Sequence, residues 1–191
     1  MKLYDLAIEN RSVRRFLEDE RISEQQLLGF IDAARFAPCG ANLQLLRFTP
    51  VTDRENCSRI FPALKWAAYL KDWRGPDPGE RPAAYIIIHI PVEERRHIPV
   101  DLGIAAAYMV LSARESDIGS CMIMSFDRKL IEKAIGTPEG YFPFLVIAFG
   151  TPAEETVLEE TDDDIRYYRD SAGRHHIPKL SLDRIITPAK D

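Results

Sequence analysis

Arg11, Ser12, Arg14 and Arg15 fall within one short stretch near the amino terminus, and they are the first residues that suggest chemistry. A guanidinium group pairs bidentately with the oxygens of a phosphate, and a serine hydroxyl offers a further donor. The cluster therefore favours a phosphate-binding site. A solvated helix end is the alternative interpretation, because runs of charge usually face water.

Two side-chain amides, Asn42 and Gln44, stand two residues apart in a loop of small residues that begins at Pro38. Each amide can both donate and accept hydrogen bonds, as the edge of a heteroaromatic ring requires. An ordinary turn at the end of a helix is the alternative, since asparagine is common in turns. That alternative explains Gln44 less well than Asn42.

A third candidate is the segment 118–124, which opens with Ile-Gly-Ser and ends with Met122, Ile123 and Met124. This apolar stretch could lie along a flat ring, with its backbone N–H groups available as donors. A buried strand that follows a helix is the alternative, because both have the same hydrophobic pattern.

Several other kinds of site are excluded by pattern. The sequence contains no G-x-G-x-x-G, no G-x-x-x-x-G-K-[ST] and no G-x-S-x-G, so the usual dinucleotide, nucleoside triphosphate and hydrolase fingerprints are absent. His175 and His176 are adjacent and cannot easily face one site, and no third ligand lies nearby. We therefore expect no metal site, and interpret these histidines as loop or pocket-lining residues.

The composition of the 191-residue chain is that of a globular protein with a single domain, with 46% hydrophobic and 29% charged residues. A net charge of -5 argues against a nucleic-acid-binding surface. The longest apolar run, 83–90, is too short to span a membrane. The amino terminus lacks a signal-peptide core, and the cysteines at 39, 57 and 121 fit neither disulfides nor zinc. We expect a cytoplasmic protein.

Hydrophobic periodicity predicts helices and strands that alternate as far as residue 150. The helices are expected at 3–7, 23–36, 100–115 and 127–135, and the strands at 46–52, 83–90, 120–124 and 144–149. The helix over 100–115 is apolar around most of its circumference, which is typical of a central or interface helix. The tail, 152–191, is acidic and then basic, and has little core of its own. It must dock on this subunit or on another.

Taken together, these motifs resemble the nitroreductase family of flavoproteins, in their order as well as their residues. The matching segments are 11–16 (RSVRRF), 34–44 (ARFAPCGANLQ), 101–106 (DLGIAA), 118–122 (IGSCM), 146–152 (VIAFGTP) and 178–182 (PKLSL). The resemblance implies an α+β sandwich, with a central, mostly antiparallel sheet flanked by helices. It also implies an intertwined homodimer, in which the tail wraps the partner and both chains line each of two FMN sites.

By position, the resemblance assigns Arg11, Ser12 and either Arg14 or Arg15 to the FMN phosphate and ribityl chain, with Lys179 adding charge at the phosphate. We also expect departures from the family pattern to matter. Asn10 stands where many members have an arginine, and the chain is short for the family.

The same resemblance assigns Asn42 and Gln44 to the ribityl chain and ring edge. Met122, Ile123 and Met124 would lie against the isoalloxazine, with a backbone N–H of that stretch directed towards N5, where it would stabilise the reduced ring.

Cys39 replaces the commoner serine beside the amide pair, where it either perturbs the flavin or packs. The segment 65–73, rich in aromatic residues, is either a substrate lid or part of the core.

The implied reaction is a ping-pong transfer of hydride from NAD(P)H through FMN to a small, planar, electron-poor acceptor such as a nitroaromatic or quinone. The resemblance identifies no catalytic side chain. The alternatives are a specialised flavin reaction, such as reductive dehalogenation, and a non-catalytic FMN-binding or regulatory protein. Fold alone does not decide among them.

Overall fold

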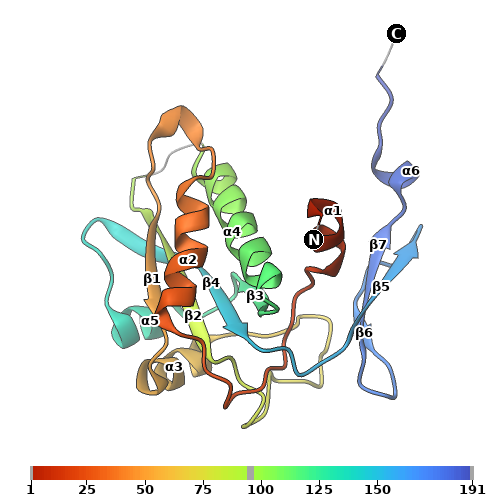
Figure 1. Ribbon diagram of the computed structural model, residues 1–191, viewed down its shortest axis with the longest axis horizontal. Coiled ribbons are helices and arrows are strands. Elements are labelled where there is room, and N and C mark those ends of the chain that lie inside the picture. Colours follow the sequence, from red (N-terminus) through yellow and green to blue (C-terminus); the bar gives the residue numbers. More distant parts are fainter. Residues whose placement is uncertain (1, 94–96, 190–191) are drawn as a thin grey trace.

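A four-stranded antiparallel sheet forms the centre of the protein in the computed structural model, which describes residues 2–93 and 97–189 (Figure 1). Its strands are β1 (Arg47–Val51), β2 (Ala84–Pro91), β3 (Gly119–Ile123) and β4 (Tyr141–Gly150), in the order β1-β2-β4-β3. Each neighbouring pair is antiparallel. The expected α+β architecture with a mostly antiparallel sheet is confirmed.

Helices cover both faces of this sheet. On one face lie α2 (Glu24–Arg35) and α4 (Ile98–Glu115), and on the other lie the shorter α3 (Arg54–Ile60) and α5 (Arg128–Ile135). Side chains of β2 alternate between the two cores, since Ile86 and Ile88 pack under α2 and α4, whereas Ile87 packs under α3 and α5. Both faces of β2 are therefore buried, which explains its continuous apolar sequence.

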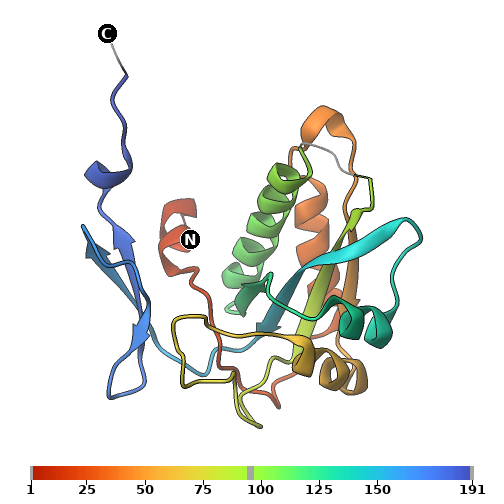
Figure 2. The ribbon, with the colours of Figure 1, turned by 180° about the vertical axis from the view of Figure 1, so that it is seen from behind.

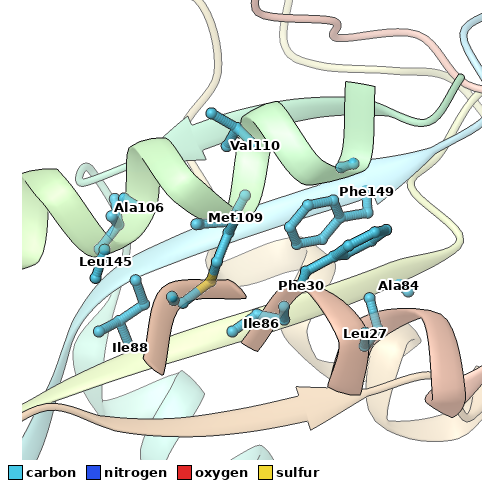
Figure 3. Packing of buried hydrophobic residues seen from close by; sticks show 14 of the residues in the cluster. Leu27, Phe30, Ala84, Ile86, Ile88, Ala106, Met109, Val110, Leu145 and Phe149 are labelled. Carbon is cyan, nitrogen blue, oxygen red and sulfur yellow. The ribbon is translucent and has the colours of Figure 1, made fainter. Parts of the chain in front are cut away.

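The core beneath α2 and α4 is shown in Figure 3, where the rings of Phe30 of α2 and Phe149 of β4 pack against each other. Their ring centroids are 5.4 Å apart, within the range of favourable aromatic pairs. Met109 of α4 is fully buried in the same cluster. This packing fixes the position of α4, whose two ends carry the candidate sites described below.

The helix predicted over 23–36 is confirmed, together with its start signal. The Ser23 hydroxyl accepts a hydrogen bond from the backbone N–H of Gln26, and the Gln26 side-chain oxygen accepts one from the backbone N–H of Ser23. This capping box satisfies two donors that the first turn would leave unpaired. The other predicted helices and strands are also present, and β4 begins three residues earlier than expected, at Tyr141.

The amino-terminal segment begins with helix α1 (Leu3–Glu9) and then runs beside the start of β3. The Val13 N–H donates to the Ser120 carbonyl at 2.9 Å, and Ser12 and Ser120 form a parallel bridge. A Cβ at Gly119 would lie 2.9 Å from the Val13 side chain. A glycine is needed here because two backbones approach closely.

The tail contains a separate three-stranded sheet that the sequence analysis did not predict. Strands β5 (Thr156–Thr161), β6 (Tyr168–Arg169) and β7 (His175–Leu180) are arranged in the order β5-β7-β6, followed by a short helix α6 (Leu182–Ile185). Figures 1 and 2 both show this sheet to one side of the body, beyond α1. Its strands are polar, and β5 pairs with β7, which is not the next strand in the sequence, so local hydrophobic periodicity gave no signal for them.

Two one-turn 3₁₀ segments, η1 (Gly40–Asn42) and η2 (Phe61–Ala63), connect these elements. Within residues 2–93 and 97–189, no helix combines the length and the apolar character needed to cross a bilayer.

Candidate functional site

A pocket of about 360 Å³ opens between the amino-terminal segment, the start of β3 and strand β7. Six of its lining residues come from segments that are far apart in the chain: Arg11, Ser12, Arg14, Ser120, Met122 and Lys179. Five of these six were predicted as cofactor-binding residues. The structure therefore brings most of the predicted phosphate cluster together.

The charge of this pocket is unbalanced. Arg11, Arg14 and Lys179 supply three cations, and no carboxylate is among the lining residues. In the part of the chain that the structure describes, no carboxylate forms an ion pair with these three side chains. Because the whole chain carries a net charge of -5, this local excess of positive charge indicates an anion-binding site.

Arg11 is held at the carboxyl end of α1. Its Nη2 donates to the Ala7 carbonyl at 2.6 Å, and its Nε donates to the Asn10 carbonyl at 2.7 Å. Carbonyl groups at a helix end have no partner within the helix and attract a cation. Partial burial lowers the pKa of Arg11, and the bonds to both carbonyls orient its charge beside the pocket.

Arg14 is fixed by two tail residues, His175 and Tyr167. Its Nη1 lies 2.8 Å from His175 Nε2, and its guanidinium lies 4.6 Å from the centre of the Tyr167 ring. Burial, together with the Arg14 charge, lowers the pKa of His175 to about 4. The imidazole is therefore neutral near pH 7 and accepts the hydrogen bond from Arg14.

Arg15 does not line this pocket. Its Nε lies 3.2 Å from a carboxylate oxygen of Glu80, and Arg15 is not among the lining residues. The family resemblance left Arg14 and Arg15 as alternatives at the phosphate. Of the two, Arg14 has its side chain in the pocket.

Side-chain alternation along β3 separates the three apolar residues expected against the flavin ring. Met122 is 49% exposed and lines the pocket. Ile123 points to the other face of β3 and is buried in the core under α3 and α5. Met124 follows the end of β3 and is not among the lining residues of the pocket. Only Met122 thus presents its side chain there.

The amide pair lies at the opposite end of α4. Gln44 lines a second pocket of about 220 Å³ together with Cys39 and Asp101. Asp101 in the first turn of α4 accepts a hydrogen bond from the Gly40 N–H at 2.8 Å, whereas Val110, nine residues further along α4, lines the arginine pocket. At 1.5 Å per residue the two sites are about 14 Å apart along the helix axis. Within one chain, the amides and the arginines are not brought together.

The backbone of the amide loop is unusual. Ala41, Asn42 and Gln44 have φ angles of 49°, 54° and 50°, in the left-handed region that non-glycine residues rarely adopt. Such strained residues cluster at functional sites because the surrounding structure must hold them. This observation supports a binding role for the loop independently of its sequence motif.

The segment 65–73 is partly core and partly surface. Trp66 is 9% exposed and belongs to the core under α3 and α5, where Trp73 also packs against it. Tyr69 is half exposed and contacts the tail, with its ring centroid 4.9 Å from that of Tyr167. The two tryptophans of this segment therefore belong to the core, whereas a role of the exposed Tyr69 in a substrate lid stays a prediction.

The adjacent histidines face different neighbours, as expected. His175 turns towards Arg14, whereas His176 lies between Glu159 and Asp170, with Nδ1 2.6 Å from Glu159 and Nε2 3.2 Å from Asp170. Among residues 2–93 and 97–189, no group of three or more His, Cys, Asp or Glu side chains is arranged to hold a metal ion.

Comparison with known proteins identifies the family of this chain. A family model described as "Nitroreductase family" matches residues 8–151, which include every segment of the arginine pocket except the tail. The chain belongs to the nitroreductase family. The resemblance drawn from the sequence motifs is confirmed, and the family fold agrees with the antiparallel sheet between two helical layers.

The individual relatives have low sequence identity to this chain, but the matches cover most of both chains. A protein of Archaeoglobus fulgidus, provisionally named an NADH dehydrogenase/NAD(P)H nitroreductase, is 27% identical over 162 residues and covers 80% of this chain and 87% of its own. An iodotyrosine deiodinase of Thermotoga neapolitana is 26% identical over 165 residues, covering 78% and 88%. An FMN-dependent nitroreductase structure from Clostridium difficile R20291 has a TM-score of 0.63 at 23% identity, covering 80% and 89%, and so is similar in fold.

Proposed function

We propose that this protein is a cytoplasmic, homodimeric oxidoreductase that binds FMN and uses a reduced nicotinamide to reduce a small, planar, electron-poor molecule, such as a nitroaromatic or a quinone. When bound, FMN would supply the redox chemistry, accepting hydride from NAD(P)H and passing it to the acceptor in a ping-pong cycle. The protein's own part is to bind, orient and polarise the cofactor.

The observation that carries this proposal is the cluster of three cations without a carboxylate, in the pocket lined by Arg11, Arg14 and Lys179. A phosphate monoester carries nearly two negative charges and accepts several hydrogen bonds. Ser12 and Ser120, which also line the pocket, offer hydroxyl donors. These residues fit the phosphate end of FMN, and the exposed Met122 offers an apolar surface for the rest of the molecule.

A dimer explains why the two halves of the predicted site lie about 14 Å apart along α4 in one chain. In a two-fold dimer, the amide loop of one copy can meet the arginine pocket of the other. Large apolar side chains exposed on α1, α4 and the tail support such an interface, since a monomer rarely leaves so many uncovered. Among them are Leu3, Tyr4, Val100, Leu182, Ile185 and Ile186.

A second candidate function is reductive dehalogenation by the same flavin. It is favoured by the similarity to the iodotyrosine deiodinase over 78% of this chain. The two candidates share the cofactor and differ only in the acceptor. Turnover of a halogenated phenol with release of halide, and none of nitroaromatics or quinones, would select this alternative.

The decisive experiment is the visible absorption spectrum of the purified protein, recorded without oxygen before and after adding NADH or NADPH. We expect flavin bands that bleach on reduction and return when a quinone or nitroaromatic is added. Flavin bands that neither nicotinamide bleaches would indicate a non-catalytic FMN-binding protein. No flavin bands after incubation with FMN would refute the proposal.

A further inference from the structure

Glu154 lies just after the central sheet, and its side chain is only 1% exposed. Its carboxylate accepts hydrogen bonds from the backbone N–H groups of Arg14 and Arg15, the latter at 3.2 Å. The same carboxylate forms an ion pair with Arg169, whose Nη2 lies at 2.7 Å. A buried carboxylate requires such partners, because its charge has lost its contact with water.

The two backbone bonds bear directly on the arginine pocket. Arg14 turns its side chain into the pocket, and Arg15 turns its side chain away towards Glu80. A rotation of this backbone would redirect both side chains, since the Cα–Cβ bond of each residue has a fixed direction relative to the backbone of that residue. By holding both N–H groups on one carboxylate, Glu154 fixes which of the two guanidinium groups lines the pocket.

Arg169 connects Glu154 to the segment 65–73. Its guanidinium lies 4.3 Å from the centre of the Trp73 ring, in a cation–π contact that is strongest when the pair is shielded from water. The Arg169 side chain is 12% exposed. The guanidinium is therefore held between a carboxylate and an indole ring, and motion of Trp73 would disturb the partner of Glu154.

A second connection runs in parallel. The Tyr167 ring contacts the Arg14 guanidinium, and its centroid is 4.9 Å from that of Tyr69. The Tyr69 backbone N–H also lies 3.4 Å from the Tyr167 hydroxyl oxygen. Tyr69 and Trp73 of this segment thus contact two tail residues. Tyr69 contacts Tyr167, which packs against the Arg14 guanidinium, and Trp73 contacts Arg169, the ion-pair partner of Glu154.

We propose that Glu154 is a positioning residue for the cofactor phosphate, and that Arg169 and Trp73 couple its position to the segment 65–73. Displacement of that segment would then loosen the grip on the phosphate, and a bound phosphate would order the segment, because coupling between two sites is reciprocal. The part concerning the cofactor rests on the proposed function, whereas the coupling itself rests on the contacts described above.

The test compares Glu154→Gln with Glu155→Gln in the full-length protein. Glu155 is the adjacent residue and is exposed, so it is a matched control for the loss of one negative charge. The dissociation constants of FMN and of riboflavin, which lacks the phosphate, are measured for each variant. Amide hydrogen exchange at Arg14, Arg15 and residues 65–73 is measured on the same samples without flavin.

We expect Glu154→Gln to weaken FMN binding about tenfold or more, as loss of a charge-assisted contact does. Riboflavin binding should change less than threefold, and exchange should rise at Arg14, Arg15 and in 65–73. Glu155→Gln should resemble the wild type in all three. A general loss of structure would weaken the binding of FMN and of riboflavin equally, and that result would contradict a role at the phosphate.

If Glu154→Gln keeps the wild-type preference for FMN, or leaves exchange at Arg14 and Arg15 unchanged, the inference is wrong. Failure of the wild type to prefer FMN would instead refute the proposed phosphate site, and the exchange measurement would still decide the coupling. Where Glu154→Gln lowers the folded yield, Arg169→Lys replaces it. Lysine keeps the positive charge but lacks the planar guanidinium. We therefore expect a smaller loss of FMN affinity and a smaller rise in amide exchange than in Glu154→Gln.

Discussion

Replacing Lys179 by methionine is the cleanest perturbation of the proposed phosphate site. Lys179 is exposed, and in the described part of the chain its ammonium group forms no ion pair. The unbranched methionine keeps an aliphatic stem of similar shape. Because the exposed Lys179 has no ion-pair partner among the described residues, the free energy of unfolding should change by less than about 0.5 kcal/mol.

The effect on FMN affinity follows from the position of the charge. Two unit charges 4 Å apart interact by about 1 kcal/mol in water and about 4 kcal/mol near a protein surface. The exposure of Lys179 puts it near the lower value, and the nearly doubled charge of a phosphate raises that value. We therefore expect a loss of about 1–2 kcal/mol, equivalent to a roughly five- to thirtyfold rise in the FMN dissociation constant.

The assay is a fluorescence titration with FMN and with riboflavin at low and high salt. The effect should be specific to FMN and should shrink at about 1 M salt, where the screening length is about 3 Å. Lys129→Met on the exposed surface of α5 is the control, because Lys129 is exposed and does not line the pocket. Equal losses for FMN and riboflavin, or no loss at low salt, would refute the reasoning.

Two further predictions concern stability. Gly150→Ala should destabilise the protein by about 1–3 kcal/mol in denaturant unfolding, because the added Cβ would lie 2.7 Å from a buried phenylalanine ring. Gly29→Ala in α2, where a Cβ meets nothing within 4 Å, should be neutral or stabilising by up to about 1 kcal/mol; equal effects of the two would contradict the argument. Hydrogen bonds to Glu159 and then Asp170 raise the pKa of His176 above 6.5. The protonated His176 therefore stabilises the fold below pH 6.5, and this contribution is lost as the pH rises through the folded-state pKa. The stability difference between wild type and His176→Gln should therefore decrease as the pH rises from 6.5 through the folded-state pKa of His176. A difference independent of pH would show that this histidine does not titrate as proposed.

Local sequence predicted the body of the fold well. The capping box at Ser23 and the isoleucine-rich run of β2 are signals that depend only on neighbouring residues, and both elements were found where expected. The sheet of the tail was missed because β5 and β7 are polar and because each residue of β5 pairs with a residue of β7 that lies 19 positions further along the chain. No local pattern encodes such a pairing.

The candidate site was predicted in its residue types but not in its geometry. The motifs pointed to Arg11, Ser12, Arg14, Met122 and Lys179, which the structure places in one pocket. They also pointed to the amide pair at 42 and 44, which the fold puts at the far end of α4. The family resemblance predicts a site shared by two chains, and this stays a prediction.

Residue types alone show which side chains can do chemistry, because arginine, serine and amide groups carry their donors wherever they stand in the chain. Which of these groups act together depends on how the chain packs. The folded chain turns Arg14 towards the pocket and Arg15 towards Glu80, and the docking of the tail sets His175 and Glu154 against Arg14. Side-chain direction depends on register and on contacts between distant segments, and these arise only when the chain packs.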